Sequence, residues 1–312
     1  MIDSLAKASR ETAALVDKAL RSAPPAIRDM TARLAEGKGK AIRARLLLAC
    51  SLDADGNIPP LAVRAAAAAE LFHLATLVHD DVIDDAETRR GQPALHRDFG
   101  RKQAVICGDY ILCMAMLTLS EGDKPDTENA EALLPSFTRA LSGVCLGELK
   151  QHQNHRNLDL TVLNYLRIIS GKTSALFYVS AYAGAVIGRG TPSEQRRLAR
   201  FGKYFGMIFQ ISDDCKDYEL SASAAGKPVG KDIAEGVVTL PLILSIAREP
   251  GLRRLAAEAF EDTALAKKLV GRVQTDDARK LAAKYAEKAR VCIKDFVPHK
   301  RGALEEILEA LN

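Results

Sequence analysis

The 312-residue chain contains no tryptophan and few other aromatic residues. Nine phenylalanines and seven tyrosines make up 5% of it, although 47% of the residues are hydrophobic. The apolar mass therefore comes mainly from alanine, leucine, valine and isoleucine, which favours a helical protein over an aromatic-rich β sandwich. A chain this long and this apolar can bury a sizeable core, which excludes general disorder.

A large excess of charge of one sign is also missing. Lysine and arginine number 44 and aspartate and glutamate 40, so the formal net charge is +4 at pH 7. Proteins that bind nucleic acid usually concentrate more basic charge than this on one face. We therefore expect no nucleic-acid partner.

No long uninterrupted hydrophobic run stands out. The most apolar stretch, residues 65–78, is short and contains Glu70 and His73, so we expect no transmembrane segment. The N-terminal stretch carries charged residues among its apolar positions, unlike a secretory leader. The six cysteines are scattered without a Cys-x-x-Cys pair and are predicted to be core residues in a reducing compartment. These features predict a cytoplasmic protein.

Proline is missing from two long stretches, residues 136–191 and 251–297. Such stretches allow long helices, and their apolar residues recur at steps of three and four, as at Leu163, Leu166 and Ile169. Glycine and proline divide the chain into roughly ten helical segments with short connections. We expect an all-α fold, a single helical bundle that forms one domain over residues 1–312.

Two clusters of aspartates carry the clearest chemical signal. Asp80, Asp81 and Asp84 follow an apolar helical run, and on a helix these spacings place the carboxylates on one face. Carboxylates about 5 Å apart repel each other by roughly 3 kcal/mol at an effective dielectric constant of about 20, so the cluster requires cations. Ligands that are all oxygen favour Mg²⁺, which keeps some waters and shares a substrate phosphate.

The same spacing recurs in Asp213, Asp214 and Asp217, again after an apolar helical run. A single acidic run is most often a solvated helix end, but two runs with identical spacing make that interpretation much weaker. In a bundle, facing helices could bring both clusters to one mouth and hold metal ions between them. Such an array would bind a diphosphate through its metals.

Basic pairs accompany the aspartates. Arg89 and Arg90 follow the first cluster, and arginine offers a planar fork of donors to phosphate oxygens. Lys40 and Arg43 stand at a predicted helix start, where free N–H groups also favour anions. Together with two metal sites, these pairs predict two separate diphosphate pockets.

The tripeptide at residues 171–173, Gly-Lys-Thr, resembles the end of a P-loop. A P-loop needs glycine five positions before Gly171, where this chain has Leu166, so a nucleotide site of that kind is excluded. Lys172 on an apolar helix is instead a costly buried cation unless an anion or a carboxylate meets it.

With these motifs assembled, the chain resembles the trans-isoprenyl diphosphate synthases, the polyprenyl synthetase family. The resemblance runs from Gly37 to Ile243 and rests on an ordered set of motifs, which occupy residues 71–96, 108–110, 147–151, 171–173, 209–214 and 226–241. It implies an all-α isoprenoid-synthase fold with a deep central cavity, and a homodimer. It also implies condensation of isopentenyl diphosphate with an allylic diphosphate, with three Mg²⁺ ions bound alongside the substrate diphosphate.

The resemblance further implies roles for individual residues. The Mg²⁺ ions would be held by the motif aspartates, namely Asp80, Asp81, Asp84, Asp213, Asp214 and Asp217. Arg89, Lys172 and Lys227 would contact the allylic diphosphate. The diphosphate of isopentenyl diphosphate would be bound by Lys40, Arg43, His73 and Arg90. Lys172, Thr173 and Gln210 would act in catalysis, with the oxygens of the last two near the reacting carbons.

The implied chemistry is an ionisation followed by an addition. Metals and cations neutralise the departing diphosphate, so the allylic C–O bond can break to a carbocation. The double bond of isopentenyl diphosphate attacks that cation, and a proton is lost to the released diphosphate, because no side-chain base is evident. Apolar helices around the clusters would exclude water, which would quench the cation.

The chain departs from the family at its GGKRxRP pattern. It has Ala41 and Ala44 where the family usually has arginine and proline, and Lys38 replaces the first glycine. Lys40 and Arg43, the two cations that touch phosphate, are retained. Weaker rather than absent binding is expected.

Residues before Asp80 predict the product length. Family members that stop early place a large aromatic residue four or five positions upstream, where this chain has Thr76 and Ala75. These small side chains leave a tunnel open, so an all-trans product of medium or long chain is predicted. Phe72, one turn further along the helix, is either the floor of that tunnel or an ordinary core residue.

Three alternatives stay open. A short-chain synthase that makes farnesyl or geranylgeranyl diphosphate shares these motifs. A class I terpene cyclase also uses an aspartate motif and Mg²⁺, but it needs no second diphosphate pocket, and Lys40, Arg43 and Arg90 argue against it. A non-catalytic subunit of a heteromeric synthase commonly loses an aspartate motif, whereas both motifs are complete here.

Overall fold

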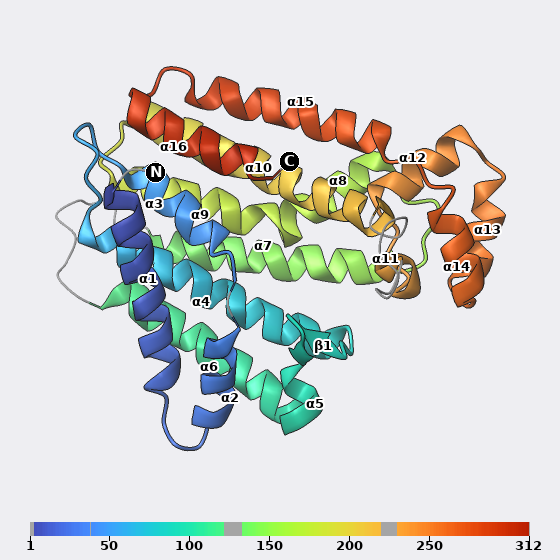
Figure 1. Cartoon of the computed structure of the whole chain (residues 1–312), viewed down its shortest axis with the longest axis horizontal. Coiled ribbons are helices and arrows are strands. Elements are labelled where there is room, and N and C mark those ends of the chain that lie inside the picture. Colours follow the sequence, from blue (N-terminus) through green and yellow to red (C-terminus); the bar gives the residue numbers. More distant parts are fainter. Residues whose placement is uncertain (1–2, 38, 122–132, 220–229, 312) are drawn as a thin grey trace. The chain divides into compact units, whose positions relative to one another are not determined.

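The computed structural model describes residues 3–37, 39–121, 133–219 and 230–311, and these residues are mostly helical (Figure 1). They form sixteen helices and one two-stranded hairpin, which confirms the predicted all-α class. The helices are α1 (Asp3–Arg21), α2 (Arg28–Glu36), α3 (Ile42–Ser51), α4 (Pro60–Ile83), α5 (Leu95–Phe99), α6 (Arg101–Ser120), α7 (Leu133–Gln153), α8 (Val162–Lys172), α9 (Ser174–Ile187), α10 (Pro192–Glu219), α11 (Lys231–Ala234), α12 (Leu240–Arg248), α13 (Leu252–Ala259), α14 (Thr263–Val270), α15 (Asp276–Ile293) and α16 (Pro298–Glu309). The strands are β1 (Thr88–Arg89) and β2 (Gln92–Pro93).

Local sequence explains where α4, which carries the first aspartate cluster, begins and ends, and where α8, which leads to residues 171–173, begins. Pro60 opens α4, where its fixed φ suits the first turn and its missing N–H leaves no donor unpaired. The helix closes at Asp84, whose backbone N–H still donates to the Asp80 carbonyl. In α8 the Thr161 side chain caps the N-terminus by accepting from the Asn164 N–H. The first aspartate cluster and residues 171–173 therefore lie at the ends of helices whose termini follow ordinary capping rules.

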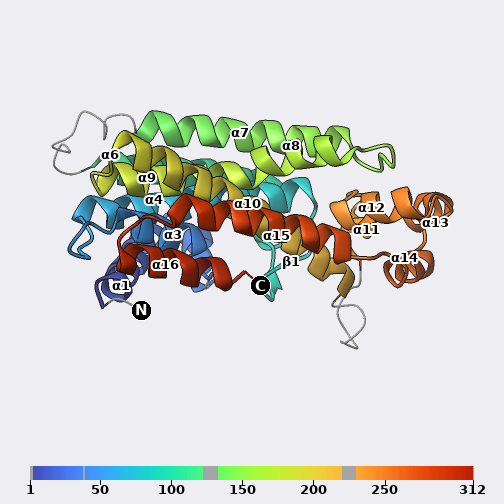
Figure 2. The same cartoon turned by 90° about the horizontal axis from the view of Figure 1, so that it is seen from above.

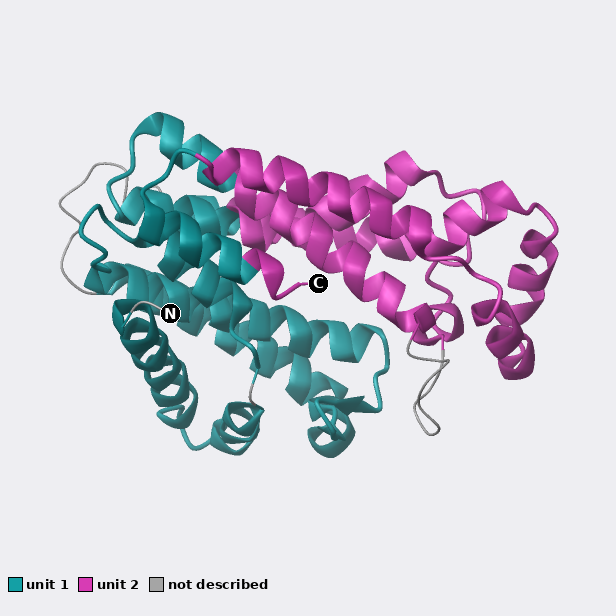
Figure 3. Cartoon of the chain, turned by 45° about the horizontal axis from the view of Figure 1, so that its top comes forward, with its two compact units in different colours: residues 1–138, 179–199, 295–307 teal, residues 139–178, 200–294, 308–312 magenta. Residues whose placement is uncertain are grey.

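The chain divides into two compact units (Figure 3). Unit 1 comprises residues 1–138, 179–199 and 295–307, and unit 2 comprises residues 139–178, 200–294 and 308–312. Helices α7, α9, α10 and α16 each contribute residues to both units. The first aspartate cluster belongs to unit 1 and the second to unit 2. The expectation of a single domain over residues 1–312 stays a prediction.

The core of unit 1 is built around α4, which lies beside α6 (Figure 1). The run of small residues 65–69 is fully buried in it, and Phe72 stacks on Phe137 with ring centroids 5.3 Å apart. Helix α9 comes so close to α3 that a Cβ on Gly184 would lie 2.3 Å from the Leu47 carbonyl oxygen. Close helix packing through small residues thus takes the place of aromatic bulk.

Helices α4 and α6 are long and apolar enough to cross a membrane by length and composition alone. Helix α4 runs over 24 residues and is thus longer than the apolar stretch 65–78, while the expectation of no transmembrane segment stays a prediction. Of the apolar window, 61% is buried within the protein in α4 but only 33% in α6. Helix α4 is therefore mainly a core element, whereas α6 leaves an apolar face uncovered, including Val105, Ile106 and Leu117.

In unit 2 an aromatic cluster joins the α8–α9 junction to α10. The Phe177 ring lies 5.1 Å from that of Phe205 and 5.3 Å from that of Phe209. Helix α8 also lies beside the part of α7 that belongs to this unit (Figure 2). These contacts hold the second aspartate cluster against residues 171–173.

Four of the six cysteines are buried, as predicted: Cys50, Cys107, Cys215 and Cys292. Burial raises the pKa of the Cys50 and Cys107 thiols to about 12, so both are protonated and unreactive at neutral pH. The prediction was wrong for Cys113 and Cys145, which lie on exposed faces of α6 and α7. All six are free thiols.

Candidate functional site

The first aspartate cluster lies at the C-terminal end of α4. Asp81 is buried, with 4% of its surface exposed, and Asp84 is exposed. Arg89 of β1 donates from Nε to Asp81 Oδ1 over 2.8 Å, and a second guanidinium nitrogen binds the same oxygen. Burial alone would lower the pKa of Arg89, but this bond and the charges of the three aspartates raise it above its ordinary value. Arg89 therefore serves as a counter-ion for the first aspartate cluster.

A tight hairpin turn aims two adjacent arginines in different directions. β1 and β2 are joined by Arg90 and Gly91, which have φ values of +53° and +80°, as a type I′ turn requires. Arg89 reaches back to Asp81, whereas Arg90 donates to the Gly37 carbonyl over 2.6 Å. A Cβ on Gly39 would lie 2.7 Å from an Arg90 nitrogen, so this loop packs directly on the guanidinium.

The residues predicted to bind a second diphosphate largely come together in unit 1. Burial and the charges of Arg43, Arg90 and Arg89 hold the pKa of His73 well below its usual value, so the imidazole is neutral. Burial also lowers the pKa of Arg43 to about 10, against the attraction of Glu70. Lys40 is exposed in the loop before α3. Of the four predicted residues, Arg43 and Arg90 thus lie near His73, and these three form a cationic cluster.

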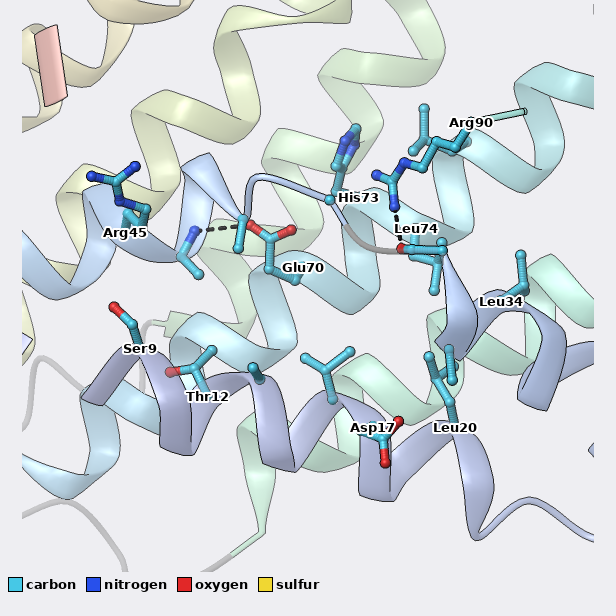
Figure 4. Close-up of a pocket in the computed structure, with 18 residues that line it drawn as sticks. Ser9, Thr12, Asp17, Leu20, Leu34, Arg45, Glu70, His73, Leu74 and Arg90 are labelled. Carbon is cyan, nitrogen blue, oxygen red and sulfur yellow. Dashed lines mark hydrogen bonds between the residues drawn. The ribbon is translucent and has the colours of Figure 1, made fainter. Parts of the chain in front are cut away.

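A cavity of about 380 Å³ adjoins this cluster (Figure 4). His73 and Arg90 line one part of it, and Leu74 and Leu77 are among its apolar walls. Glu70 also lines it and accepts a hydrogen bond from the Ala44 N–H over 2.9 Å. A proline has no N–H, so the departure from the family pattern at Ala44 supplies a bond that the usual residue could not make.

The Gly-Asp motif of α6 packs against the residue before the first aspartate. A Cβ on Gly108 would lie 2.4 Å from His79 Nε2. The same nitrogen lies 3.2 Å from the Asp109 carboxylate and 3.2 Å from the Val105 carbonyl. The motif thus fixes the end of α4 beside Asp80.

The second cluster gives its three aspartates different environments. Asp213 is exposed, and Asp217 accepts from the backbone N–H groups of Lys231 and Asp232 over 3.1 and 3.0 Å, which caps α11. Asp214 is buried, and its two oxygens accept from the Tyr165 hydroxyl over 2.5 Å and from the Gln210 amide over 2.7 Å. Among these three carboxylates, Asp214 is therefore the one directed into the protein.

The carboxylates of the second cluster repel one another. Burial, with repulsion from Asp213 and Asp217, raises the pKa of Asp214 to about 7, although its two hydrogen bonds act to lower it. Burial and repulsion from Asp214 and Asp217 raise the pKa of Asp232 well above its usual value. Asp232 was not among the predicted site residues, although it lies within the motif at residues 226–241. Carboxylates in this state favour a bound cation.

The residues predicted to act in catalysis meet at the end of α8. The Lys172 ammonium lies 2.7 Å from Glu148 Oε2, which supplies the carboxylate that a poorly exposed lysine requires. The Thr173 hydroxyl donates to Gln210 Oε1 over 2.6 Å. A Cβ on Gly147 would lie 2.2 Å from the Lys172 backbone nitrogen, so glycine is needed where α7 meets this junction. Lys227 lies outside the described residues.

The donor set fits Mg²⁺ that is only partly coordinated by protein. Within the described ranges, no three histidine, cysteine or acidic side chains are grouped closely enough to hold a metal ion. Mg²⁺ usually keeps several waters and binds through one or two carboxylates plus substrate phosphates. All six predicted ligands are aspartates, so they would suit such a shared ion rather than a closed protein cage.

The residues predicted to set product length lie on the buried side of α4. Ala75 is 1% exposed, and the Thr76 hydroxyl donates to the His73 carbonyl over 2.8 Å. Phe72 is fully buried in its stack with Phe137. Any role for Phe72 in product length therefore involves a pair of rings.

Comparison with known proteins places these features in context. The family described as Polyprenyl synthetase matches residues 24–273. The chain is 36% identical over 236 residues to a short chain isoprenyl diphosphate synthase from Methanothermobacter thermautotrophicus, covering 72% of each chain. It is 33% identical over 245 residues to octaprenyl diphosphate synthase from Haemophilus influenzae, covering 77% of this chain and 72% of that one. A solved polyprenyl synthase from Caulobacter crescentus, complexed with calcium and isoprenyl diphosphate, is 31% identical with a TM-score of 0.85, covering 100% of this chain and 97% of that one.

Proposed function

Because this chain belongs to the polyprenyl synthetase family, a family of prenyltransferases, we propose that it condenses isopentenyl diphosphate with an allylic diphosphate by 1′-4 chain elongation. The observation that carries the proposal is the combination of two aspartate clusters with a separate cationic cluster around His73. A terpene cyclase would have no use for the latter. The Caulobacter relative, solved with a divalent cation and an isoprenyl diphosphate, supports the same substrate chemistry.

The aspartates of both clusters, apart from the buried Asp214, would bind Mg²⁺ together with the allylic diphosphate, with three ions in all. The bound ions supply neutralisation of the charge that develops on the leaving diphosphate. Arg89 would offer its guanidinium fork to diphosphate oxygens at the edge of the first cluster, and Lys172 would offer its ammonium beside Thr173. Both cations are held by carboxylates, Asp81 and Glu148, so both are oriented before substrate arrives.

The cationic cluster would bind the diphosphate of isopentenyl diphosphate. Arg43 and Arg90 bring positive charge. His73 is neutral, so it can donate one N–H to the anion without adding a third charge that the arginines would repel. Exposed Lys40 would close over the bound anion from the loop before α3. The apolar walls near Leu74 and Leu77 would exclude water from the hydrocarbon end.

The reaction would then proceed without a protein base. The allylic C–O bond breaks as its diphosphate leaves, and the double bond of isopentenyl diphosphate attacks the resulting carbocation. The oxygens of Thr173 and Gln210 would lie near the positive charge, and the departing proton would go to the released diphosphate. The side chains bind, orient and shield the reactants, which is the main requirement of such chemistry.

We propose a product of medium or long chain. The small side chains of Ala75 and Thr76 favour it, and the octaprenyl relative supports it. The stacked rings of Phe72 and Phe137 would form the floor of the tunnel into which the product grows. A short-chain product is the second candidate, because a relative with 36% identity is a short chain isoprenyl diphosphate synthase.

A second copy of the chain would cover the apolar face of α6. Val105, Ile106 and Leu117 are 38%, 52% and 49% exposed. Helix α6, which carries them, is as apolar as the core helix α4. A homodimer is therefore proposed. Separately, the cytoplasm is the compartment proposed for it. Ile106→Glu should give monomers by light scattering, whereas Lys284→Glu, at an exposed position of α15, should leave the dimer intact.

The decisive experiment combines the purified chain with Mg²⁺, isopentenyl diphosphate and farnesyl diphosphate. Diphosphate release and a longer extracted lipid would support the proposal, and the length of that lipid separates the medium- or long-chain product from the short-chain one. No release in the presence of Mg²⁺ would refute a stand-alone synthase. Release that appears only after a second protein is added would identify a subunit of a heteromeric enzyme.

A further inference from the structure

A chain of hydrogen bonds in unit 2 links Tyr165 to Thr173. The Tyr165 hydroxyl donates to Asp214 Oδ2 over 2.5 Å, and the Gln210 amide donates to Asp214 Oδ1 over 2.7 Å. The Thr173 hydroxyl in turn donates to Gln210 Oε1 over 2.6 Å. Tyr165 lies in α8, Thr173 caps that helix, and both Gln210 and Asp214 lie one turn apart on α10.

This series of hydrogen bonds is buried, and the direction of each bond is fixed. Tyr165, Asp214 and Thr173 are only 3%, 5% and 8% exposed, so water cannot readily replace a lost partner. Asp214 accepts on both oxygens, and the Gln210 NH₂ group must therefore face it. A flipped amide would place the Gln210 carbonyl against a carboxylate oxygen, which leaves two acceptors in contact without a proton.

The orientation of Gln210 decides what Thr173 can present. With its carbonyl held toward Thr173, Gln210 accepts the hydrogen bond that the Thr173 hydroxyl donates. The Thr173 oxygen can then offer only its lone pairs to any other neighbour. An electron-rich oxygen suits a developing positive charge, whereas a hydroxyl proton aimed the same way would oppose it.

We propose that Tyr165 and Asp214 are positioning residues that hold Gln210, and through it the Thr173 hydroxyl, in the orientation that stabilises the allylic carbocation. This inference rests on the proposed prenyl transfer. It removes Asp214 from the group of metal ligands expected from its motif, because this carboxylate is buried and each of its oxygens accepts a hydrogen bond from a side chain inside the protein. It also gives Tyr165, which no motif argument singled out, a role in the reaction.

The test compares Tyr165→Phe with Tyr178→Phe, an exposed tyrosine in the same unit. Loss of one positioning hydrogen bond should lower kcat about tenfold. The KM values for both substrates and the Mg²⁺ concentration for half-maximal activity should stay unchanged, and Tyr178→Phe should behave as wild type. A folded Tyr165→Phe protein with wild-type kcat would overturn the proposal.

A double-mutant cycle separates positioning from general support of the fold. Because Tyr165 acts through Gln210, Tyr165→Phe should cause little further loss of kcat in a Gln210→Ala background. Two losses that simply multiply would contradict the proposal. If Tyr165→Phe does not fold, Asp214→Asn carries the same cycle.

Asp214→Asn also distinguishes positioning from metal binding. An asparagine can turn either its oxygen or its NH₂ toward Gln210, so it no longer fixes which way the Gln210 amide faces, and kcat should fall with the Mg²⁺ dependence unchanged. A large increase in the Mg²⁺ requirement would instead make Asp214 a ligand and refute the proposal. A wild-type chain that releases no diphosphate would refute the proposed function, a result separate from either outcome.

Discussion

Replacing Phe72 tests the proposed floor and the packing of unit 1 together. The Phe72 ring is 0% exposed and stacks on Phe137 with centroids 5.3 Å apart at an interplanar angle of 20°. A buried Phe→Ala change costs about 3–5 kcal/mol through lost burial and the cavity that remains. The ring pair contributes about 0.5–1.5 kcal/mol of the interaction that is lost.

The expected outcome of Phe72→Ala is a folded but less stable protein with longer products. Chain extension past Ala75 is then no longer stopped by a ring, so extracted lipids should gain isoprene units. Phe72→Leu serves as the matched control, because a side chain of more similar size should cost only about 1 kcal/mol and keep the floor in place. Urea unfolding followed by circular dichroism measures stability, and chromatography of the dephosphorylated lipids measures length.

Two outcomes would contradict this reasoning. Wild-type product lengths from folded Phe72→Ala would show that the ring pair is ordinary core packing. A stability loss below about 1 kcal/mol would show that the site collapses around the smaller side chain, against the close packing seen here.

Three further predictions follow from particular contacts. Gly147→Ala should destabilise the protein and abolish diphosphate release, because its Cβ would lie 2.2 Å from the Lys172 backbone nitrogen. As the control, Gly302→Ala in α16 has open space around its Cβ and should raise the free energy of unfolding by up to about 1 kcal/mol in the same urea assay. Burial and neighbouring arginines depress the pKa of His73, so the unfolded state binds more protons there and the free energy of unfolding should fall as pH drops below about 6.5, a dependence that His73→Gln should reduce. A chelator should stop diphosphate release and added Mg²⁺ should restore it, and activity that persists without the ion would exclude the proposed cofactor role.

Several features of the fold and site follow from short-range pattern. Helical periodicity and the scarcity of aromatic residues predict the all-α class, and the structure confirms it. The spacing of Asp80, Asp81 and Asp84 predicts that they share one helix face because a helix repeats every 3.6 residues, and the structure places them at the C-terminal end of α4. The carboxylate that Lys172 required is present as Glu148, although the sequence did not indicate which acidic residue would supply it.

Tertiary structure decided matters that spacing could not. Asp213, Asp214 and Asp217 have the same residue type and motif, yet one is exposed, one is buried between Tyr165 and Gln210, and one caps α11. Two of these environments depend on distant segments, because Tyr165 lies 49 residues from Asp214 and Lys231 lies 14 residues from Asp217. The same holds for the exposed thiols, because an apolar run does not specify which face another element covers.

The sequence by itself determined the helical class and the family, and it predicted the residues that carry the chemistry, because these depend on composition and on spacings within a few helical turns. Only the tertiary structure decided which of those residues are directed into the protein, which are paired, and which face of α6 stays uncovered. Burial and hydrogen bonding between distant segments set the pKa and the orientation of a side chain. Identical aspartates thereby acquire different properties, and the scarce aromatic residues become specific, as in the stack of Phe72 on Phe137.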